Sequence, residues 1–254
     1  METAKSRVTG ESMRVAIVST PRTCSSFLGS MMAKKYKLEE YSEIFSYGNA
    51  SVERGMEKLQ KLKDTDNYSV KITSTSFRLH TEIISPETFP WEIFDKIILA
   101  EREDLSQQVA SWMLLNHAQL NGHFDHNNLV KYLTIELKNV QNIPFLDHDF
   151  ENVMTDINYF YNEIKNSLIK FADKVNVVKY ELLQKQPEDY LTELNNILET
   201  DFSIQDISGV ATKTELDYTP FIDYYNLREK VYATKEENNE SVTTEHPFEN
   251  EGTV

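Results

Sequence analysis

Short apolar, β-rich runs alternate along this chain with segments of helical periodicity. The clearest run is Val15 to Val18, which carries no charge, and three further candidate strands lie at 69–73, 95–100 and 175–180. Short runs of this kind are typical of strands buried on both faces, as in a parallel sheet. We therefore expect a sheet built from at least four strands.

Between these runs, apolar residues recur at spacings of three and four. This pattern predicts helices from about residue 25, over 51–62, from Leu105 onward with Val109, Trp112 and Leu115 on one face, and over 152–171, 187–198 and 221–232. The polar segments 117–150 and 203–218 are expected to be irregular. Alternating strands and helices predict an α/β fold, a central and mostly parallel sheet flanked by helices.

Composition divides the 254 residues into three parts. Residues 1–12 are polar and are expected to form a flexible N-terminus, and residues 13–232 are expected to form one α/β domain. Residues 233–254 contain six Glu and one Lys, so we expect an acidic, disordered tail.

The formal net charge of −15 argues against nucleic acid or an anionic membrane as a partner. Any anionic ligand therefore needs a locally basic pocket. The single cysteine excludes an internal disulfide and suits a reducing compartment. Without a signal-peptide pattern or an apolar run of about 18 residues, the chain is expected to be soluble and cytoplasmic.

The segment after the first strand combines features of an anion-binding loop. Residues 19–26 hold Arg22 and several hydroxyl side chains, and a helix is expected to start near Ser25 or Ser26. Unpaired amides and the positive end of the helix dipole favour anions there. An ordinary strand–turn–helix capped by serines is the alternative. The loop has neither the Walker A pattern nor G-x-G-x-x-G, which disfavours a nucleoside triphosphate site.

The loop also resembles a known one. Pro21-Arg22-Thr23-Cys24-Ser25-Ser26 matches five of six positions in the 5′-phosphosulfate loop of sulfotransferases that use 3′-phosphoadenosine 5′-phosphosulfate (PAPS). The departure is Cys24, where that family usually has Gly, a residue that takes positive φ freely. The resemblance implies the P-loop-like sulfotransferase fold and the soluble, bacterial or phage-like branch of the family.

Two further motifs follow in the family's order. Arg102 ends the third strand and Ser111 lies on the next helix, where sulfotransferases place an Arg and a Ser on the 3′-phosphate. The segment Val177 to Leu183 resembles the family's V-x-Y-E-D-L, and its Tyr180-Glu181 is interpreted as structural. The alternative for Arg102 is a surface ion cluster with Glu101, Glu103 or Asp104.

The resemblance implies a role for each candidate residue. Cofactor-binding residues would be Arg22, Thr23, Cys24, Ser25, Ser26, Arg102, Ser111, Lys213 and Arg228. Catalytic residues would be Arg22, Lys71 beside the transferring sulfuryl group, and Glu43 as the base, with His80 in reserve. A partly exposed structural lysine and a solvated glutamate are the alternatives for Lys71 and Glu43.

The implied function is transfer of a sulfuryl group from PAPS to an acceptor hydroxyl or amine, leaving adenosine 3′,5′-bisphosphate. The acceptor is a small molecule, a sugar or a peptide that the sequence does not identify. No metal is expected, since His117, His123, His126 and His148 show no ligand spacing. A nucleotide-dependent kinase with a degenerate phosphate loop and an inactive PAPS-binding protein remain alternatives.

Overall fold

The computed structural model describes residues 13–41, 52–74, 77, 84–123, 126–211 and 216–243. These residues belong to two compact units rather than to one. The first unit is drawn from Met1–Asp104 and Tyr159–Glu215, and the second from Leu105–Asn158 and Leu216–Val254. Each unit is described by itself below.

The first unit contains a five-stranded sheet. Its strands are β1 (Met13–Ser19), β2 (Glu39–Tyr41), β3 (Asn67–Thr73), β4 (Lys96–Glu101) and β5 (Val175–Lys179), in the order β2-β3-β1-β4-β5. Every pairing between neighbours is parallel. The predicted fold class, α/β with a parallel sheet flanked by helices, is confirmed, as are the four predicted strands.

Side chains of β1 alternate between two cores, because successive residues of a strand point to opposite faces. Ala16 and Val18 lie in one apolar cluster with Leu59 and Leu62 of α2 (Val52–Lys63) and Ile164 of α7 (Tyr161–Leu168). Val15 and Ile17 lie in the other cluster, and all four β1 residues are fully buried. The sheet is therefore covered on both faces, which explains why its central strand is apolar without interruption.

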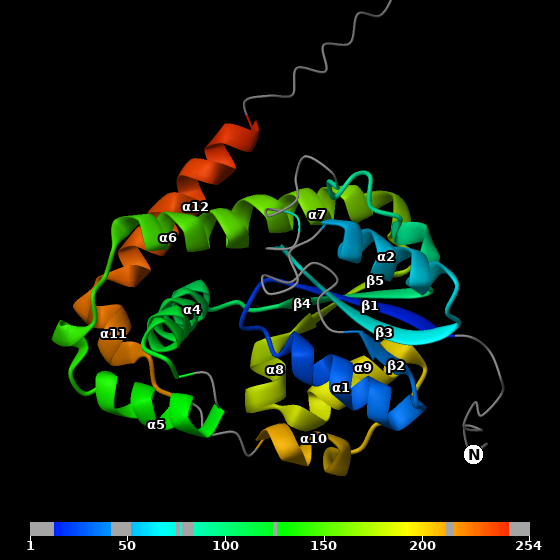
Figure 1. The fold of residues 1–254 in the computed structure, drawn as a ribbon, viewed down its shortest axis with the longest axis horizontal. Helices are drawn as coiled ribbons and strands as arrows, with labels where there is room; N and C mark the ends of the chain where they lie inside the picture. Colours follow the sequence, from blue (N-terminus) through cyan, green and yellow to red (C-terminus); the bar gives the residue numbers. More distant parts are fainter. Residues whose placement is uncertain are drawn as a thin grey trace, which may run out of the picture. The chain divides into compact units, whose positions relative to one another are not determined.

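The second cluster of this unit is formed by the other helices. These are α1 (Ser25–Tyr36), α8 (Tyr180–Lys185), α9 (Pro187–Leu198) and α10 (Ile204–Ala211). Figure 1 shows α1, α8, α9 and α10 on one face of the sheet and α2 and α7 on the other. The sequence predicts α1, α2 and α9, including Pro187 as the first residue of α9. It misses α10, since residues 203–218 read as a loop.

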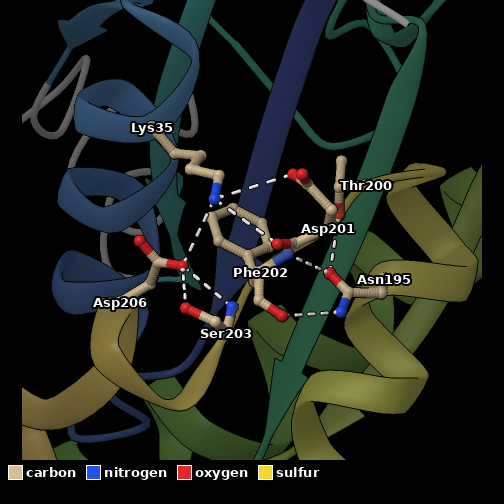
Figure 2. A network of polar contacts seen from close by, with 7 residues as sticks. All are labelled: Lys35, Asn195, Thr200, Asp201, Phe202, Ser203 and Asp206. Carbon is tan, nitrogen blue, oxygen red and sulfur yellow. Dashed lines mark hydrogen bonds and ion pairs between the residues drawn. The ribbon is translucent and has the colours of Figure 1, made fainter. Parts of the chain in front are cut away.

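The segment that leads into α10 is fixed by the polar network in Figure 2. Asn195 accepts from the backbone of Phe202 at 2.7 Å and donates to its carbonyl at 2.9 Å. Asp206 accepts from the amide and the hydroxyl of Ser203, each at 2.8 Å, and Lys35 lies 3.4 Å from the same carboxylate oxygen. The Asp206 carboxylate thus satisfies the amide of Ser203 at the start of α10, and Lys35 ties this carboxylate to the last turn of α1.

This network predicts a pH-dependent contribution to stability. The Ser203 amide, the Ser203 hydroxyl and Lys35 hold the pKa of Asp206 below its ordinary value of 3.8. A carboxyl group with a lowered pKa in the folded state stabilises the protein above its unfolded pKa and stops doing so as pH falls through the folded pKa. We expect Asp206→Asn to cost about 1 kcal/mol at pH 7 and progressively less as the pH falls below the ordinary pKa of 3.8. Urea unfolding of both proteins at pH 7, 5 and 3 measures this; a pH-independent difference would contradict it.

The second unit is helical. It contains α4 (Leu105–Leu120), α5 (His126–Glu136), α6 (Asp147–Met154), α11 (Thr219–Tyr224) and α12 (Leu227–Thr243), which share one apolar cluster. The prediction that 117–150 is irregular is wrong for α5, because Leu133 and the half-buried Leu129 and Tyr132 give this polar stretch a face to bury. The predicted face of α4 is correct in part, since Val109 is buried in this cluster and Leu105 and Trp112 pack against it, whereas Leu115 does not. Trp112 and Leu115 are half-buried, and the buried positions are Ser106, Gln108, Val109, Ala110, Ser111, Met113, Leu114 and Ala118.

The long helix predicted over 152–171 begins earlier and is not α-helical throughout. Helical residues run from Asp147 to Phe171, with a π-helical segment at Thr155–Phe160 between α6 and α7 and a 3₁₀ turn at Ile169–Phe171. Val153, Ile157, Ile164 and Leu168 are buried, as their spacing predicts. The boundary between the two units falls inside the π-helical segment.

The C-terminal part contains more helix than the sequence predicts. Two helices, α11 and α12, replace the single one expected over 221–232, and α12 continues to Thr243. Residues 233–243 are therefore helical rather than disordered, because the chain has helix-forming Ala, Lys and Glu there and no Gly or Pro before Pro247. Residues 1–12 and 244–254 lie outside the described part. Among the described helices, none combines the length and apolarity needed to cross a membrane.

Candidate anion-binding site

Four strands of the first unit end at the same edge of the sheet. Ser19 of β1 pairs with Thr73 of β3 and with Ala100 of β4, and Glu101 of β4 pairs with Lys179 of β5. Parallel strands share their carboxyl ends, and ligands of open α/β sheets bind outside those ends. The residues that follow β1, β4 and β5 therefore meet along this edge.

The loop between β1 and α1 has the backbone pattern of a phosphate-binding nest. Arg22 and Cys24 adopt left-handed conformations, with φ of 66° and 59°, whereas Thr23 between them does not. Alternating handedness turns successive amides toward a common concavity that binds anions. The loop runs directly into α1, whose N-cap, Cys24, gives no side-chain cap and whose first turn carries no acid. The positive end of the helix dipole is thus not neutralised by the helix itself.

Two of the predicted hydroxyl donors, Thr23 and Ser25, form hydrogen bonds within the loop and its flanking residues. Thr23 is buried and donates to the carbonyl of Thr20 at 3.1 Å, so its proton is used within the loop. Ser25 is buried and accepts from the hydroxyl of Ser19 at 2.9 Å, which leaves its own proton available. Ser26 is exposed. The geometry therefore favours Ser25 and Ser26 over Thr23 as hydroxyl donors to an anion.

Cys24 occupies the position where a glycine would be least strained. A left-handed conformation costs an ordinary side chain about 1–2 kcal/mol, and more for a β-branched one. We expect Cys24→Gly to leave the free energy of unfolding within about 0.5 kcal/mol, since the strain it relieves is offset by added entropy of the unfolded chain. Cys24→Val should lose about 1–2 kcal/mol. Chemical denaturation of both variants tests this, and equal stabilities would mean that position 24 has no left-handed requirement.

Lys71 reaches the first turn of α1 from the neighbouring strand. It lies on β3, opposite Ile17 of β1, and its Nζ donates to the Ser26 hydroxyl at 3.0 Å. Lys71 therefore lies beside the start of α1. Its role toward a transferring group remains a prediction.

Arg102 approaches the loop from the end of β4. Its guanidinium donates to the carbonyl of Arg22 at 3.4 Å, and its guanidinium carbon lies 4.6 Å from the centre of the Tyr180 ring. Its Nε is buried and finds no hydrogen-bond acceptor among the residues that the structure describes. Buried donors without an acceptor are uncommon in folded proteins, so this N–H is a candidate contact for a ligand.

The carboxylates on either side of Arg102 are engaged elsewhere. Glu101 accepts from Lys165 at 2.9 Å and from the Tyr161 hydroxyl at 3.0 Å. Glu103 binds Lys179 at 2.6 Å, and this hydrogen bond and charge hold the pKa of Glu103 below its usual range. Within the described part of the chain, no ion pair joins Arg102 to an acid. The surface ion cluster weighed for Arg102 is not what forms there.

Two candidates belong to the second unit. Ser111 is buried on α4 and donates to the Tyr218 hydroxyl at 3.2 Å, and Arg228 is exposed on α12. Their predicted association with the cofactor remains a prediction. His117 contacts Tyr132 at 3.0 Å, and no three His, Cys, Asp or Glu side chains gather into a possible metal site within the described residues.

Three predicted residues fall outside the described part of the chain. They are the candidate bases Glu43 and His80 and the candidate cofactor residue Lys213. Nothing in the structure bears on their roles. Their assignment to the site remains a prediction from the sequence.

The contacts of Tyr180 and Glu181 with the segment that follows β4 are not predicted from the sequence. The Tyr180 ring forms a cation–π contact with the Arg102 guanidinium, and the Glu181 carboxylate accepts from the amides of Glu103 and Asp104 at 3.0 and 3.3 Å. The sequence does indicate that Arg102 and Tyr180 each directly follow a strand. That the two residues are neighbours follows only from the strand order, which places β5 next to β4.

The solved structures that are similar to this chain include three sulfotransferases. A sulfotransferase domain from the curacin biosynthetic pathway is 13% identical, with a TM-score of 0.43 over 83% of this chain and 80% of the other. Mouse sulfotransferase SULT7A1, crystallised with PAP, is 14% identical, with a TM-score of 0.41 over 80% and 64%. The sulfotransferase domain of a Synechococcus PCC 7002 olefin synthase is 13% identical, with a TM-score of 0.39 over 88% and 91%. No protein-family model and no curated protein sequence matches the chain.

Proposed function

We propose that this protein is a sulfotransferase that binds PAPS at the carboxyl edge of its sheet. The observation that carries the proposal is the convergence of Arg22, Lys71 and Arg102 on a left-handed loop at a helix N-terminus. This convergence occurs in a chain with a net charge of −15. A local group of cations within an acidic protein supports an anionic ligand.

The residues present fit a ligand with two anionic ends. The loop amides, Ser25, Ser26 and Lys71 would hold the 5′-phosphosulfate, since they surround the start of α1. Arg102 would hold the 3′-phosphate, for which a planar guanidinium offers a bidentate fork. Its buried Nε would then gain the acceptor that the described residues do not provide.

PAPS supplies an activated sulfuryl group. In the transfer, the bond from sulfur to the bridging oxygen breaks and its electron pair remains on the 5′-phosphate, while sulfur bonds to the acceptor oxygen or nitrogen. Arg22, Lys71 and the amides of the loop would stabilise the charge that builds on the bridging oxygen. Glu43, or His80 in its place, would take the acceptor proton.

A transfer assay tests this function. The protein is incubated with PAPS carrying ³⁵S in the sulfuryl group and with separate pools of alcohols, phenols, sugars and amines. We expect label to appear in one acceptor class together with release of adenosine 3′,5′-bisphosphate, without added magnesium.

Other results would select the alternatives. Binding of PAPS with no transfer to any pool would indicate an inactive PAPS-binding protein. Phosphate transfer from ATP with magnesium, and none of the sulfuryl group, would indicate a kinase and contradict the proposal.

A further inference from the structure

Arg102 and Tyr180 leave the sheet side by side. Glu101, the last residue of β4, is paired with Lys179, the last residue of β5. The next residue on each chain segment is therefore Arg102 on one side and Tyr180 on the other. This register, rather than nearness in sequence, brings a guanidinium and an aromatic ring together.

The Tyr180 ring supports the guanidinium from one face. The guanidinium carbon lies 4.6 Å from the ring centre, within the range of a cation–π contact. A stacked guanidinium keeps its N–H donors at the rim of its plane. One donor reaches the carbonyl of Arg22 at 3.4 Å, and the buried Nε has no acceptor in the described part of the protein.

Glu181 fixes the backbone that follows Arg102. One carboxylate oxygen accepts from the amide of Glu103 at 3.0 Å and from the amide of Asp104 at 3.3 Å. These two bonds set the path of the turn between β4 and α4. The adjacent side chains of Glu101 and Glu103 are bound by Lys165 and Lys179, so they do not compete for the guanidinium.

We propose that Tyr180 and Glu181 are positioning residues that hold Arg102 ready for the 3′-phosphate. This inference rests on the proposed function. An arginine that is free to rotate loses side-chain entropy when it binds a phosphate, whereas one already stacked and hydrogen-bonded loses less. The dipeptide that the sequence analysis interpreted as structural thereby acts on affinity for one end of the nucleotide.

The test compares two nucleotides that differ only in the 3′-phosphate, adenosine 3′,5′-bisphosphate and adenosine 5′-monophosphate. Tyr180→Leu removes the ring, and Tyr180→Phe keeps it. We expect Tyr180→Leu to weaken bisphosphate binding about 5- to 10-fold with little change for the monophosphate, and Tyr180→Phe to stay within about twofold of wild type. Glu181→Gln, which keeps one acceptor oxygen but loses the charge, should also weaken only the bisphosphate.

A second readout does not depend on nucleotide. The ¹⁵N relaxation of the Arg102 Nε, assigned by its loss in Arg102→Lys, reports whether the guanidinium is immobilised. We expect a rigid Nε in wild type and Tyr180→Phe and a mobile one in Tyr180→Leu.

Four outcomes would overturn the inference or its premise. Wild-type affinity for the bisphosphate in Tyr180→Leu, or equal losses for both nucleotides, would refute the positioning role. A rigid Nε in Tyr180→Leu would refute the support by the ring. A wild-type protein that does not distinguish the two nucleotides would refute the 3′-phosphate role of Arg102 and the proposed function with it, while the Nε signal still decides whether Tyr180 holds the side chain.

Discussion

Arg22→Ala is expected to abolish sulfuryl transfer and to weaken binding of both adenosine 3′,5′-bisphosphate and adenosine 5′-monophosphate. Arg22 is exposed in the loop that precedes α1, and its backbone is left-handed. Alanine has a similar cost in that conformation, so the change should leave the fold intact. Losing a charged hydrogen bond weakens binding roughly 10- to 100-fold, and losing a donor to the leaving oxygen slows transfer about 10²-fold or more.

Lys34→Ala is the matched control for this variant. Lys34 is exposed on the last turn of α1, so its removal changes the net charge equally at the opposite end of the same helix. Calorimetric titration and the transfer assay should find it unchanged. An Arg22→Ala protein with full activity, or equal losses in both variants, would contradict the loop assignment.

Arg102→Ala is expected to remove the preference for the bisphosphate over the monophosphate. A guanidinium bound to one phosphate contributes to the affinity of whichever nucleotide carries that phosphate, so only bisphosphate binding should fall, by roughly 10- to 100-fold. Arg102→Lys keeps the charge but loses the planar fork and the stacking on Tyr180. It should recover only part of the affinity.

The two arginine variants therefore give different patterns. Arg22→Ala lowers affinity for both nucleotides, and Arg102→Ala lowers it for one. The preference is measured as a ratio of dissociation constants, so a general loss of folded protein cancels. Equal losses for both nucleotides in Arg102→Ala would mean that this arginine supports the loop carbonyl of Arg22 and binds no phosphate of its own.

The sequence predicts the parts of the fold that follow from local patterns. The uncharged run Val15 to Val18 is β1, and α1 begins at Ser25, because apolar runs and helical spacing are set by the residues themselves. Gly would be unstrained at the position of Cys24, and the structure places Cys24 at φ of 59°. The loop motif thus predicts a backbone feature as well as a ligand.

The remaining features depend on contacts that a single chain segment does not reveal. Helix α5 lies in a stretch rich in Asn and His, and it forms because Leu133 packs into the core of the second unit. The buried residues of α4 include Ser106 and Gln108, which hydrophobicity alone does not select. The stacking of Arg102 on Tyr180 depends on the pairing of β4 with β5, which is set by the sheet order.

Calorimetric titration of the wild-type protein with adenosine 3′,5′-bisphosphate tests the central claim most directly. Adenosine 5′-monophosphate and ATP serve as comparison ligands, each without and with magnesium. The account predicts metal-independent binding of the bisphosphate that is tighter than binding of either comparison ligand. Tighter binding of ATP that requires magnesium, or no binding of any of the three, would contradict it.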